Sequence, residues 1–538
     1  MGTVVDRCLE ILEEYGIHVA YPDVVHEEVA RLLRAPGIDD SVLLDLTTVP
    51  FVTIDNAGSR DLDQALYIER SGDHGYRVDY ALADAAHFVQ PNTALYRESL
   101  RRGVTFYLPG FSVPMLPPSL SEGIVSLNAG ELRRALVFRI ELDGAGEVIR
   151  THIERARIRS RRKLTYSGVQ AFYDDADGTL SHAEFTESLR LLKEVGERRL
   201  LRARQRGIVL YRRTETEVAV DPTDPSRLVI HERERNDVER YNEQISLLCN
   251  EEAARFLVRG LKREGVVAIY RVHKSPPRTR LEQYRELVRS VVRIHGLDPQ
   301  IWDWRREEGE GLGEFLERLP VSGSKARISQ ALQRQAIMIN QAAEFSTEPD
   351  RHHGTGAEPY ARASSPMRQQ VGIDTHHTIV EKRYGCIIEG QADAETMVEM
   401  ANRTQQLQRN VDKAVDHLLL RQCLDAELGR SDRSVFRGTV LGLTARRTYV
   451  RFDDPPLEVK LYHDDLETVC GAPFTLQDHD TRLKSGRQGV PDLLLGGEVR
   501  VSVEGFDASR SRYVFRLVPS LEDGNPDMSG DHEEHERK

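Results

Sequence analysis

The sequence lacks the features that mark secreted, metal-stapled or membrane-spanning proteins. Its 538 residues contain five cysteines, which lie far apart and form no CxxC pair, so neither a disulfide framework nor a cysteine zinc site is expected. No run approaches the roughly 20 apolar residues that a membrane-spanning helix needs, and the first residues lack a basic segment followed by an apolar one. We therefore expect a cytoplasmic protein with reduced cysteines and no membrane partner.

The chain also has no excess of positive charge. Its formal net charge is −12, with 30% charged and 39% hydrophobic residues, a composition typical of soluble globular proteins. Two arginine-rich runs, 150–163 and 198–206, are strongly basic despite the negative net charge of the chain. Either each run is the solvated face of a helix, or together they line an internal basic channel inside an acidic shell.

Length and pattern predict an α+β protein with several parts. Apolar residues at helical spacing predict helices at Val4–Tyr15 and Asp23–Leu33, with Asp23 as the N-cap of the second. This helical segment, residues 1–45, is either a helix-turn-helix-like module or an N-terminal brace. A large body over residues 46–428 follows, with strand-like runs at Pro50–Ile54, Tyr76–Ala83 and Ala135–Leu142 and helical patterns at 185–206 and 238–260.

Residues 432–518 have a different, β-rich pattern. Short strand-like runs separated by turns lie at Val435–Leu443, Tyr449–Phe452, Glu458–Leu461, Glu498–Phe506 and Arg512–Leu517. Such a pattern fits a small OB-fold β-barrel, which binds oligonucleotides, or a protein-contact module. Residues 519–538 are acidic and polar, and we expect them to be disordered.

The most informative stretch is TIDNAGSRDLDQA at residues 53–65, which holds Asp55, Asp61 and Asp63 between two apolar runs. An extended backbone would put Asp61 and Asp63 on one face, with Asp55 folded over them. Carboxylates this close repel by roughly 4 kcal/mol per pair at an effective dielectric of about 20, so a hard cation such as Mg²⁺ would neutralise them. A solvated turn whose acids face water is the alternative that spacing leaves open.

Further segments stand in a fixed order along the chain, namely ADAAHFV at 83–89, VPMLP at 113–117, EQISLLCN at 243–250 and SSPMR at 364–368. With the aspartate run they resemble the ribonuclease II/ribonuclease R family, whose catalytic domain shows TID-x5-D-x-D-D-A, an IADVSHYV-like strand, a VPMLP loop, an EE-x4-AN helix and a TSPIRR segment. The resemblance covers residues 45–425. It implies an RNB-type catalytic domain followed by an RNA-binding OB domain, here without recognisable N-terminal cold-shock domains.

The resemblance also implies an activity, namely hydrolytic 3′→5′ degradation of single-stranded RNA to nucleoside 5′-monophosphates. Asp55, Asp61 and Asp63 match metal-binding residues for one or two Mg²⁺ ions, or Mn²⁺, and Asp61, Asp63 and Arg368 match the catalytic positions. Arg368 would clamp the scissile phosphate. We expect the enzyme to be a monomer. The expected RNA-binding residues are Tyr107, Tyr166, Glu243 and His273.

Two departures from the family pattern leave a second interpretation open. Gln64 stands where the family has another aspartate, so a neutral amide replaces one metal ligand, and the segment after Arg368 lacks the expected second arginine, tyrosine and aspartate. The alternative is therefore an RNA-binding or regulatory protein with a weakened or lost active site. For single residues, the structural alternatives are a salt bridge for Arg368 and core packing for His273 and the tyrosines.

Overall fold

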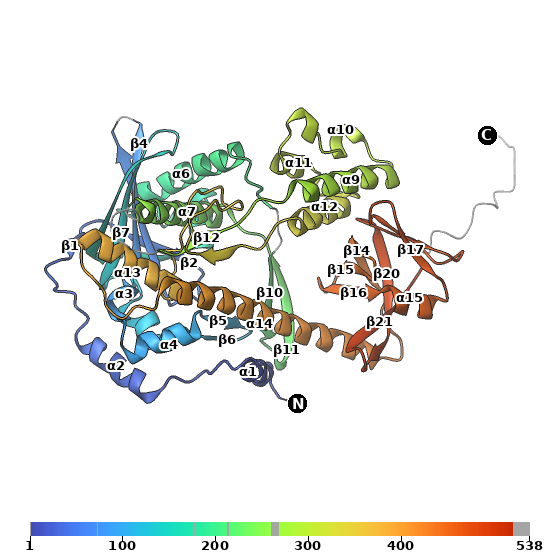
Figure 1. Ribbon diagram of the computed structural model, residues 1–538, viewed down its shortest axis with the longest axis horizontal. Helices are drawn as coiled ribbons and strands as arrows, with labels where there is room; N and C mark the ends of the chain where they lie inside the picture. Colours follow the sequence, from blue (N-terminus) through green and yellow to red (C-terminus); the bar gives the residue numbers. More distant parts are fainter. Residues whose placement is uncertain (1, 73, 177, 212–214, 260–267, 520–538) are drawn as a thin grey trace, which may run out of the picture. The chain divides into compact units, whose positions relative to one another are not determined.

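The computed structural model describes residues 2–72, 74–176, 178–211, 215–259 and 268–519 (Figure 1). The chain divides into two compact units. Unit 1 comprises residues 1–276, 311–317 and 340–419, and unit 2 comprises residues 277–310, 318–339 and 420–538. The limits 46–428 and 432–518 stay a prediction, and this division differs from them because it groups most of residues 277–339 with the C-terminal unit. The predicted disordered tail lies outside the described residues, except for Pro519.

Both N-terminal helices form where their apolar spacing predicts them. Helix α1 (Val4–Glu14) begins with a capping box, in which the Thr3 hydroxyl accepts the N–H of Asp6 at 3.2 Å. Helix α2 (Asp23–Arg34) has Pro22 as its N-cap, so the predicted cap is wrong by one residue, since the extended chain already ends at Pro22. Glu28 of α2 accepts the first N–H groups of α4 (Ala94–Arg102), which fastens the N-terminal segment to the rest of unit 1.

Unit 1 is built around a seven-stranded sheet of order β1-β8-β7-β4-β3-β2-β9. Its strands are β1 (Leu44–Asp45), β2 (Val52–Asp55), β3 (Gln64–Ser71), β4 (Gly75–Ala83), β7 (Leu132–Leu142), β8 (Val148–Arg159) and β9 (Arg162–Thr165). The run from β3 through β8 is antiparallel, whereas β1 and β9 add parallel edges. Strand β4 is buried along nearly its whole length, because separate hydrophobic clusters pack against the sheet.

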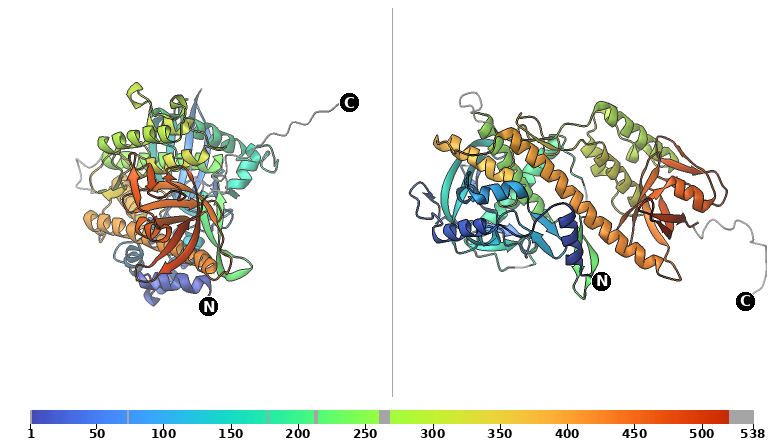
Figure 2. Two further views of the ribbon diagram at one scale, coloured as in Figure 1. Left: turned by 90° about the vertical axis from the view of Figure 1, so that its right-hand side faces the viewer. Right: turned by 60° about the horizontal axis from the view of Figure 1, so that its bottom comes forward.

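Two long helices, α6 (Thr186–Gln205) and α7 (Asp237–Val258), lie side by side and contribute to the same core cluster as the central strands (Figure 1 and Figure 2). Both confirm the predicted helices at 185–206 and 238–260, although Gly260 lies outside the described residues. The remaining elements of unit 1 are α3 (Ala85–Phe88), β5 (Phe106–Leu108), β6 (Phe111–Val113), η1 (Ser119–Ile124), α5 (Tyr166–Tyr173), β10 (Glu215–Asp221), β11 (Asp224–Arg233), β12 (Tyr270–Val272), β13 (Glu344–Ser346), α13 (Gln370–Tyr384) and most of α14 (Ala394–Leu428).

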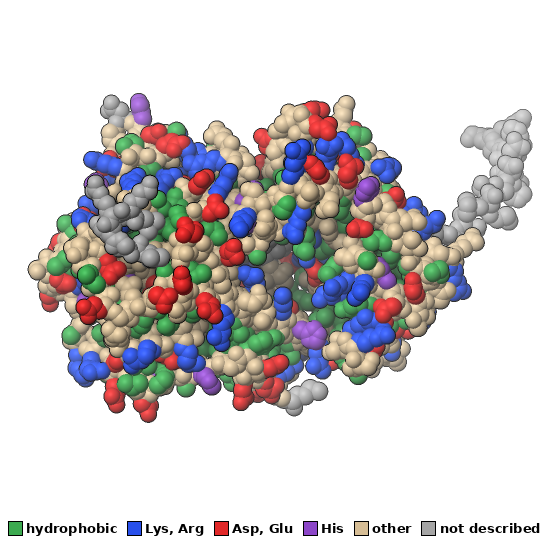
Figure 3. All heavy atoms as spheres, viewed as in Figure 1, with side chains coloured by type: hydrophobic (Ala, Val, Ile, Leu, Met, Phe, Trp, Pro, Cys, Tyr) green, Lys and Arg blue, Asp and Glu red, His purple; other side chains and the backbone are tan. Residues whose placement is uncertain are grey.

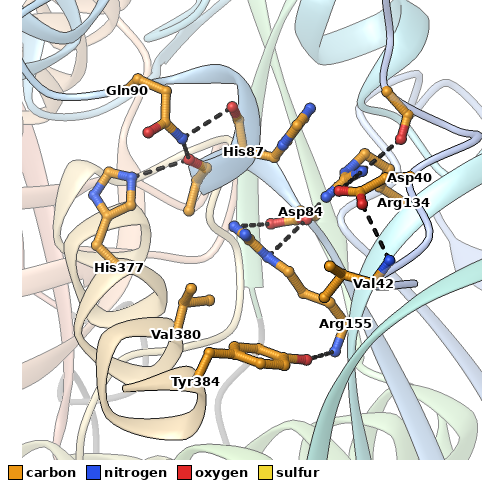
Figure 4. A network of polar contacts seen from close by, with 12 residues as sticks. Asp40, Val42, Asp84, His87, Gln90, Arg134, Arg155, His377, Val380 and Tyr384 are labelled. Atoms are coloured by element: carbon orange, nitrogen blue, oxygen red, sulfur yellow. Dashed lines mark hydrogen bonds and ion pairs between the residues drawn. The ribbon is translucent and has the colours of Figure 1, made fainter. Parts of the chain in front are cut away.

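The segment 83–89 departs from the strand that the family resemblance implies. Strand β4 ends at Ala83, and the next residues form the short helix α3. Asp84 sits at this change of direction and is only 1% exposed. The chain turns here because the Asp84 carboxylate is held by buried arginines of the neighbouring strands (Figure 4).

Unit 2 joins a helical part to a β-rich part. The helices are α9 (Arg278–Ile294), α10 (Pro299–Trp302), η2 (Arg306–Glu308) and α12 (Ala326–Met338), while the short helix α11 (Leu312–Arg318) belongs almost wholly to unit 1. Five strands, β14 (Phe436–Leu443), β15 (Arg447–Phe452), β16 (Glu458–Tyr462), β20 (Glu498–Asp507) and β21 (Arg512–Leu517), form a sheet of order β16-β15-β14-β20-β21.

All five strands predicted for residues 432–518 are thus confirmed. A small sheet of β17 (Phe474–Gln477), β18 (Arg482–Ser485) and β19 (Leu493–Leu494), and helix α15 (His463–Cys470), were not predicted. Over the described part of unit 2, β16 and β21 approach but do not pair, so the OB-type sheet is not a closed barrel. Figure 2 shows these red strands gathered in one β-rich body.

The arginine-rich runs do not form an unneutralised basic channel, because most of their guanidinium groups meet carboxylates. The pairs are Arg150–Glu141, Arg155–Asp84, Arg157–Asp45, Arg161–Glu184, Arg198–Glu194, Arg199–Glu251, Arg202–Glu147, Arg204–Glu317 and Arg206–Glu251. Basic and acidic side chains are likewise interspersed on the face seen in Figure 3. This pairing leaves little unneutralised positive charge for the predicted basic channel. The helix-face interpretation is wrong for the first run, because most of it forms strand β8, whereas the second run lies on helix α6. All five cysteines are free, and none of the described helices combines the length and apolar character needed to span a bilayer.

Candidate functional site

The predicted carboxylate run folds as an irregular loop between β2 and β3. Asp55 ends β2, and its Oδ1 accepts the N–H of Asn56 at 2.7 Å and the hydroxyl of Ser59 at 2.9 Å. Asp61 is half-buried and accepts the phenolic O–H of Tyr107 at 3.3 Å. Strand β3 begins only at the residue after Asp63, so Asp61 and Asp63 precede the strand rather than lie in it.

Asp63 is the most buried of the three aspartates, at 1% exposure, and protein donors reach both of its oxygens. Oδ1 accepts the N–H of Met367 at 2.9 Å, and Oδ2 accepts Nε–H of Arg368 at 2.6 Å. Burial raises the pKa of Asp63 to about 6, against the opposing effect of the Arg368 charge. The carboxylate therefore fastens the Arg368 segment to the start of the central sheet.

Arg368 is held from a second side and still reaches solvent. Its Nη2 donates to the hydroxyl of Ser365 at 3.0 Å, and 31% of its side chain is exposed. Burial by itself lowers the pKa of Arg368, but Asp63, Tyr107, Asp61 and Asp55, in that order, raise it above its ordinary value. The structure thus brings the three predicted aspartates and Tyr107 around one guanidinium group. Ser365 has φ 62°, an uncommon value for a residue with a side chain, and this turn points Arg368 back toward Asp63.

A polar stripe on α7 supports this site, and the sequence analysis missed it. Asn242, Ser246 and Asn250 recur every fourth residue, so they share one face of the helix. Asn242 donates to the hydroxyl of Tyr166 at 3.2 Å, which confirms that Tyr166 lies beside α7. The Asn250 amide donates to Ser364 at 2.9 Å and its Oδ1 accepts the N–H of that residue at 2.8 Å, which fixes the turn before Arg368. The sequence signal that could have indicated this stripe is the four-residue spacing of polar residues within a largely buried helix.

Gln64 is turned away from the aspartates. Its Oε1 accepts the hydroxyl of Tyr80 on β4 and the hydroxyl of Ser246 at 3.3 Å. A carbonyl oxygen has two lone pairs, so these contacts use its acceptor capacity. The amide at this position therefore serves the packing between the sheet and α7.

Two predicted RNA-binding residues are not brought to the aspartates in the part of the chain that the structure describes. Glu243 is exposed on α7 and pairs with Arg235 at 3.1 Å, because it points aside from the Asn242–Ser246 face. His273 packs edge to face against His352, with ring centroids 5.2 Å apart, and accepts the N–H of Gly354 at 3.1 Å. A histidine cluster, rather than the aspartate loop, surrounds His273.

The predicted metal site of three aspartates stays a prediction. Among the described residues, no group of three or more His, Cys, Asp or Glu side chains converges as a metal-binding set. The reason is that Asp63 is committed to Met367 and Arg368. One oxygen each of Asp55 and Asp61 accepts no hydrogen bond from the described chain. Mg²⁺ commonly uses one or two carboxylates plus waters and substrate phosphates, so the free oxygens of Asp55 and Asp61 fit such an ion.

Asp374 is another buried carboxylate and follows Arg368 closely along the chain. It lies on α13 at 5% exposure, with Oδ1 accepting the hydroxyl of Tyr96 at 3.1 Å and Oδ2 accepting the Gln370 amide at 3.1 Å. No cation lies within ion-pair distance of it among the described residues. Burial accordingly raises the pKa of Asp374 to about 7.

We expect the Asp374→Asn variant to be more stable than the unmodified protein in alkaline solution. Between the unfolded pKa of about 3.9 and the folded value, only the folded protein holds the proton, so stability falls as pH rises through this range. Asparagine removes this loss, and the free energy of unfolding at about pH 8 should rise by about 1–3 kcal/mol, with little change at about pH 4. Urea unfolding at both pH values measures this. Asp350→Asn, at an exposed position, is the control, and a parallel shift in both variants would contradict the prediction.

The chain was compared with known protein families and solved structures. It matches the RNB domain over residues 44–380. Ribonuclease R of Escherichia coli K12 is 27% identical over 540 residues, which cover 96% of this chain and 62% of that protein. Ribonuclease R of Aquifex aeolicus is 26% identical, covering 95% of this chain and 70% of that protein. The chain thus spans less than two thirds of the length of the Escherichia coli relative.

Solved structures show the same fold. Mycoplasma genitalium RNase R in complex with ribose-methylated single-stranded RNA superposes with a TM-score of 0.81 at 21% identity, covering 96% of this chain and 78% of that one. Its apo form superposes with a TM-score of 0.79. The RNB match extends from β1 to the middle of α13 and includes the aspartate loop and Arg368. Because this match covers more than half of its residues, the chain belongs to the RNB-domain family.

Proposed function

We propose that the protein is a hydrolytic 3′→5′ exoribonuclease that degrades single-stranded RNA to nucleoside 5′-monophosphates. The observation that carries this proposal is the Arg368 guanidinium, which is held by Asp63, surrounded by carboxylates and still open to solvent. The relatives named ribonuclease R and the RNA-bound Mycoplasma genitalium structure support RNA as the substrate.

The chain's own residues have distinct roles in this proposal. Arg368 binds the scissile phosphate and stabilises the charge that develops there, while Asp63 orients the guanidinium. Tyr107 is 53% exposed beside Asp61, where its ring can stack on a base regardless of sequence. A divalent ion such as Mg²⁺ or Mn²⁺, bound at Asp55 and Asp61, would supply an activated water.

The domains follow from the same proposal. Residues 46–428 carry catalysis, residues 432–518 bind RNA through the five-stranded OB-type sheet, and residues 1–45 brace the catalytic part. The enzyme acts as a cytoplasmic monomer.

Digestion of single-stranded RNA tests the proposed activity. The full chain with Mg²⁺ should shorten a 5′-labelled oligoribonucleotide stepwise from its 3′ end and release mononucleotides, and a chelator should stop the reaction. A matched RNA with a blocked 3′ end is the control for direction. Internal cleavage products, or no mononucleotides at any metal concentration, would overturn the proposal.

A second candidate function is RNA binding without hydrolysis, and the contacts of Gln64 favour it. Its carbonyl oxygen is occupied by Tyr80 and Ser246, so it offers no replacement for a metal-binding carboxylate. Yeast Ssd1, whose structure is titled a pseudonuclease, superposes with a TM-score of 0.62 at 14% identity, covering 84% of this chain and 54% of that one.

The variant Gln64→Asp separates the two functions, with Gln64→Asn as the neutral control. In the binding protein, the unmodified chain holds RNA without turnover, and only Gln64→Asp releases mononucleotides. In the enzyme, the unmodified chain already turns over, which would exclude the second candidate.

A further inference from the structure

A cavity of about 90 Å³ lies within unit 1, beside the segment that carries Arg368. Its walls come from β12, β13, α14 and the residues just before α13. The polar side chains among its lining residues are those of Arg271, Arg362, Gln369, Thr404, Gln405 and Gln408. A single water needs about 10–15 Å³ of such space, so the cavity has room for several waters or one tetrahedral oxyanion.

The cavity carries positive charge without a matching acid. Among the described residues, neither Arg271 nor Arg362 has a carboxylate within the 4.0 Å ion-pair distance. Nε of Arg362 is buried and has no hydrogen-bond partner there. Burial, with the repulsion of Arg362 and Arg409, lowers the pKa of Arg271 to about 10. A half-buried guanidinium group without a carboxylate is unfavourable, and an anion is the partner that would satisfy it.

The surroundings orient these groups for an anion. The Arg271 guanidinium lies over the ring of Phe345, 4.6 Å from its centroid, which fixes its plane. Guanidinium groups bind phosphate with parallel N–H donors, and the glutamine amides of the walls offer further donors. The lining therefore suits a phosphate group better than a neutral or cationic ligand.

The cavity and the aspartate site lie on opposite sides of one short segment. Gln369 has an extended backbone, φ −144° and ψ 125°, and successive side chains of an extended chain point to opposite faces. Arg368 accordingly meets Asp63, whereas Gln369 lines the cavity. Val104 pairs with Gln369 across this segment. The cavity is therefore a separate site, one residue away from the Arg368 clamp.

We propose that this cavity is a phosphate-binding site, in which Arg271 and Arg362 hold a phosphate group and Gln369 links the site to the Arg368 segment. The phosphate comes either from the backbone of a bound RNA strand or from a free nucleoside monophosphate. This inference does not require that the protein hydrolyses RNA, since it needs only the anion and the guanidinium groups.

The test uses the full chain in chelator, so that no RNA is degraded. Binding of inorganic phosphate, AMP and a short single-stranded oligoribonucleotide is measured by calorimetry, and melting temperature is followed at matched ionic strength in chloride and phosphate. The variants are Arg271→Gln and Arg362→Gln, with Arg271→Lys as a milder change. Arg403→Gln, at an exposed position on the same helix α14 that lines the cavity, is the control.

Phosphate should raise the melting temperature of the unmodified protein and of the control. Either glutamine variant should bind the ligand that supplies the phosphate at least about tenfold more weakly, since a hydrogen bond to a charged group is worth about 1.5–3 kcal/mol. In chloride, these variants should melt no lower than the unmodified protein, because a like-charge repulsion is relieved. A purely structural role would lower melting in both salts.

The ligands identify the source of the phosphate. Weaker AMP and phosphate binding with unchanged RNA affinity assigns the site to free nucleotides. Weaker RNA binding with a shallower salt dependence assigns it to the strand. Equal binding of all three ligands by the unmodified protein and both glutamine variants would overturn the inference. The digestion assay tests the proposed exoribonuclease activity separately, so the phosphate site and the proposed activity can fail independently.

Discussion

Replacement of Asp63 by asparagine is expected to lower kcat on single-stranded RNA by about 10²–10³-fold, the loss typical of removing one preorganised group that stabilises transition-state charge. The physical reason is the 2.6 Å contact between Oδ2 of Asp63 and Nε of Arg368. Asparagine has the shape of aspartate but not its charge. The Arg368 guanidinium group is then no longer held in its orientation. KM should change little, since Asp63 is buried and does not reach bound RNA itself.

Arg368→Lys should reproduce this loss. A lysine has one ammonium group in place of the planar fork that contacts both Asp63 and Ser365, so it cannot keep both contacts and bind the phosphate. Steady-state and single-turnover kinetics with a labelled oligoribonucleotide measure both variants. Asp45→Asn, which alters an exposed ion pair with Arg157, is the control. Undiminished kcat in Asp63→Asn would remove the Asp63–Arg368 pair from the catalytic machinery.

The largest expected effect on stability is that of Asp84→Asn. The Asp84 carboxylate is fully buried between Arg134, at 3.4 Å, and Arg155, at 3.1 Å (Figure 4). Without it, the guanidinium groups of Arg134 and Arg155, from the adjacent strands β7 and β8, lose their shared carboxylate, and breaking a buried pair from one side typically lowers stability by about 3–5 kcal/mol. Urea unfolding near neutral pH measures the loss.

Asp40→Asn is the matched control, because Asp40 also pairs with Arg134, at 3.2 Å, but is 37% exposed. Its loss should stay below about 1 kcal/mol. Although burial alone would raise it, the pKa of Asp84 is lowered by Arg155 and Arg134. Its stabilisation is therefore full above the unfolded pKa of about 3.9 and is lost as pH falls through the folded value. Equal losses in the two variants would show that burial does not decide the strength of this network.

Much of the fold was predictable because its signals are local. Helices α1, α2, α6 and α7, strands β2, β4 and β7 and the five-stranded sheet of unit 2 follow from the period of their apolar residues, since period and burial are set by the same geometry. The long strand β8 was not predicted. The end of β4 was predicted, but the helix α3 after it was not, because Asp84 meets arginines that lie 50 and 71 residues away. No local pattern carries that contact.

The candidate site, like the fold, was predictable from the sequence only in part. The aspartate run and the SSPMR segment, met in order along the chain, were enough to point to the RNB-domain family and to place Asp63 and Arg368 in one site, although 305 positions separate them. The spacing of Asp55, Asp61 and Asp63 suggested a shared metal site but gave no sign that Arg368 and Met367 would contact Asp63. The spacing of residues shows only which carboxylates are close along the chain. The hydrogen-bond donors that contact their oxygens come from distant segments.

The sequence by itself therefore determined the family, most of the secondary structure and the residues that carry charge at the site. Only the tertiary structure decided which partners those charges meet: Asp63 binds Arg368, Gln64 accepts from Tyr80, and Arg271 and Arg362 line a cavity without an acid. The physical reason is that apolar periodicity and motif order are properties of one segment, while the partner of a buried charge is set by whichever segments the fold brings against it.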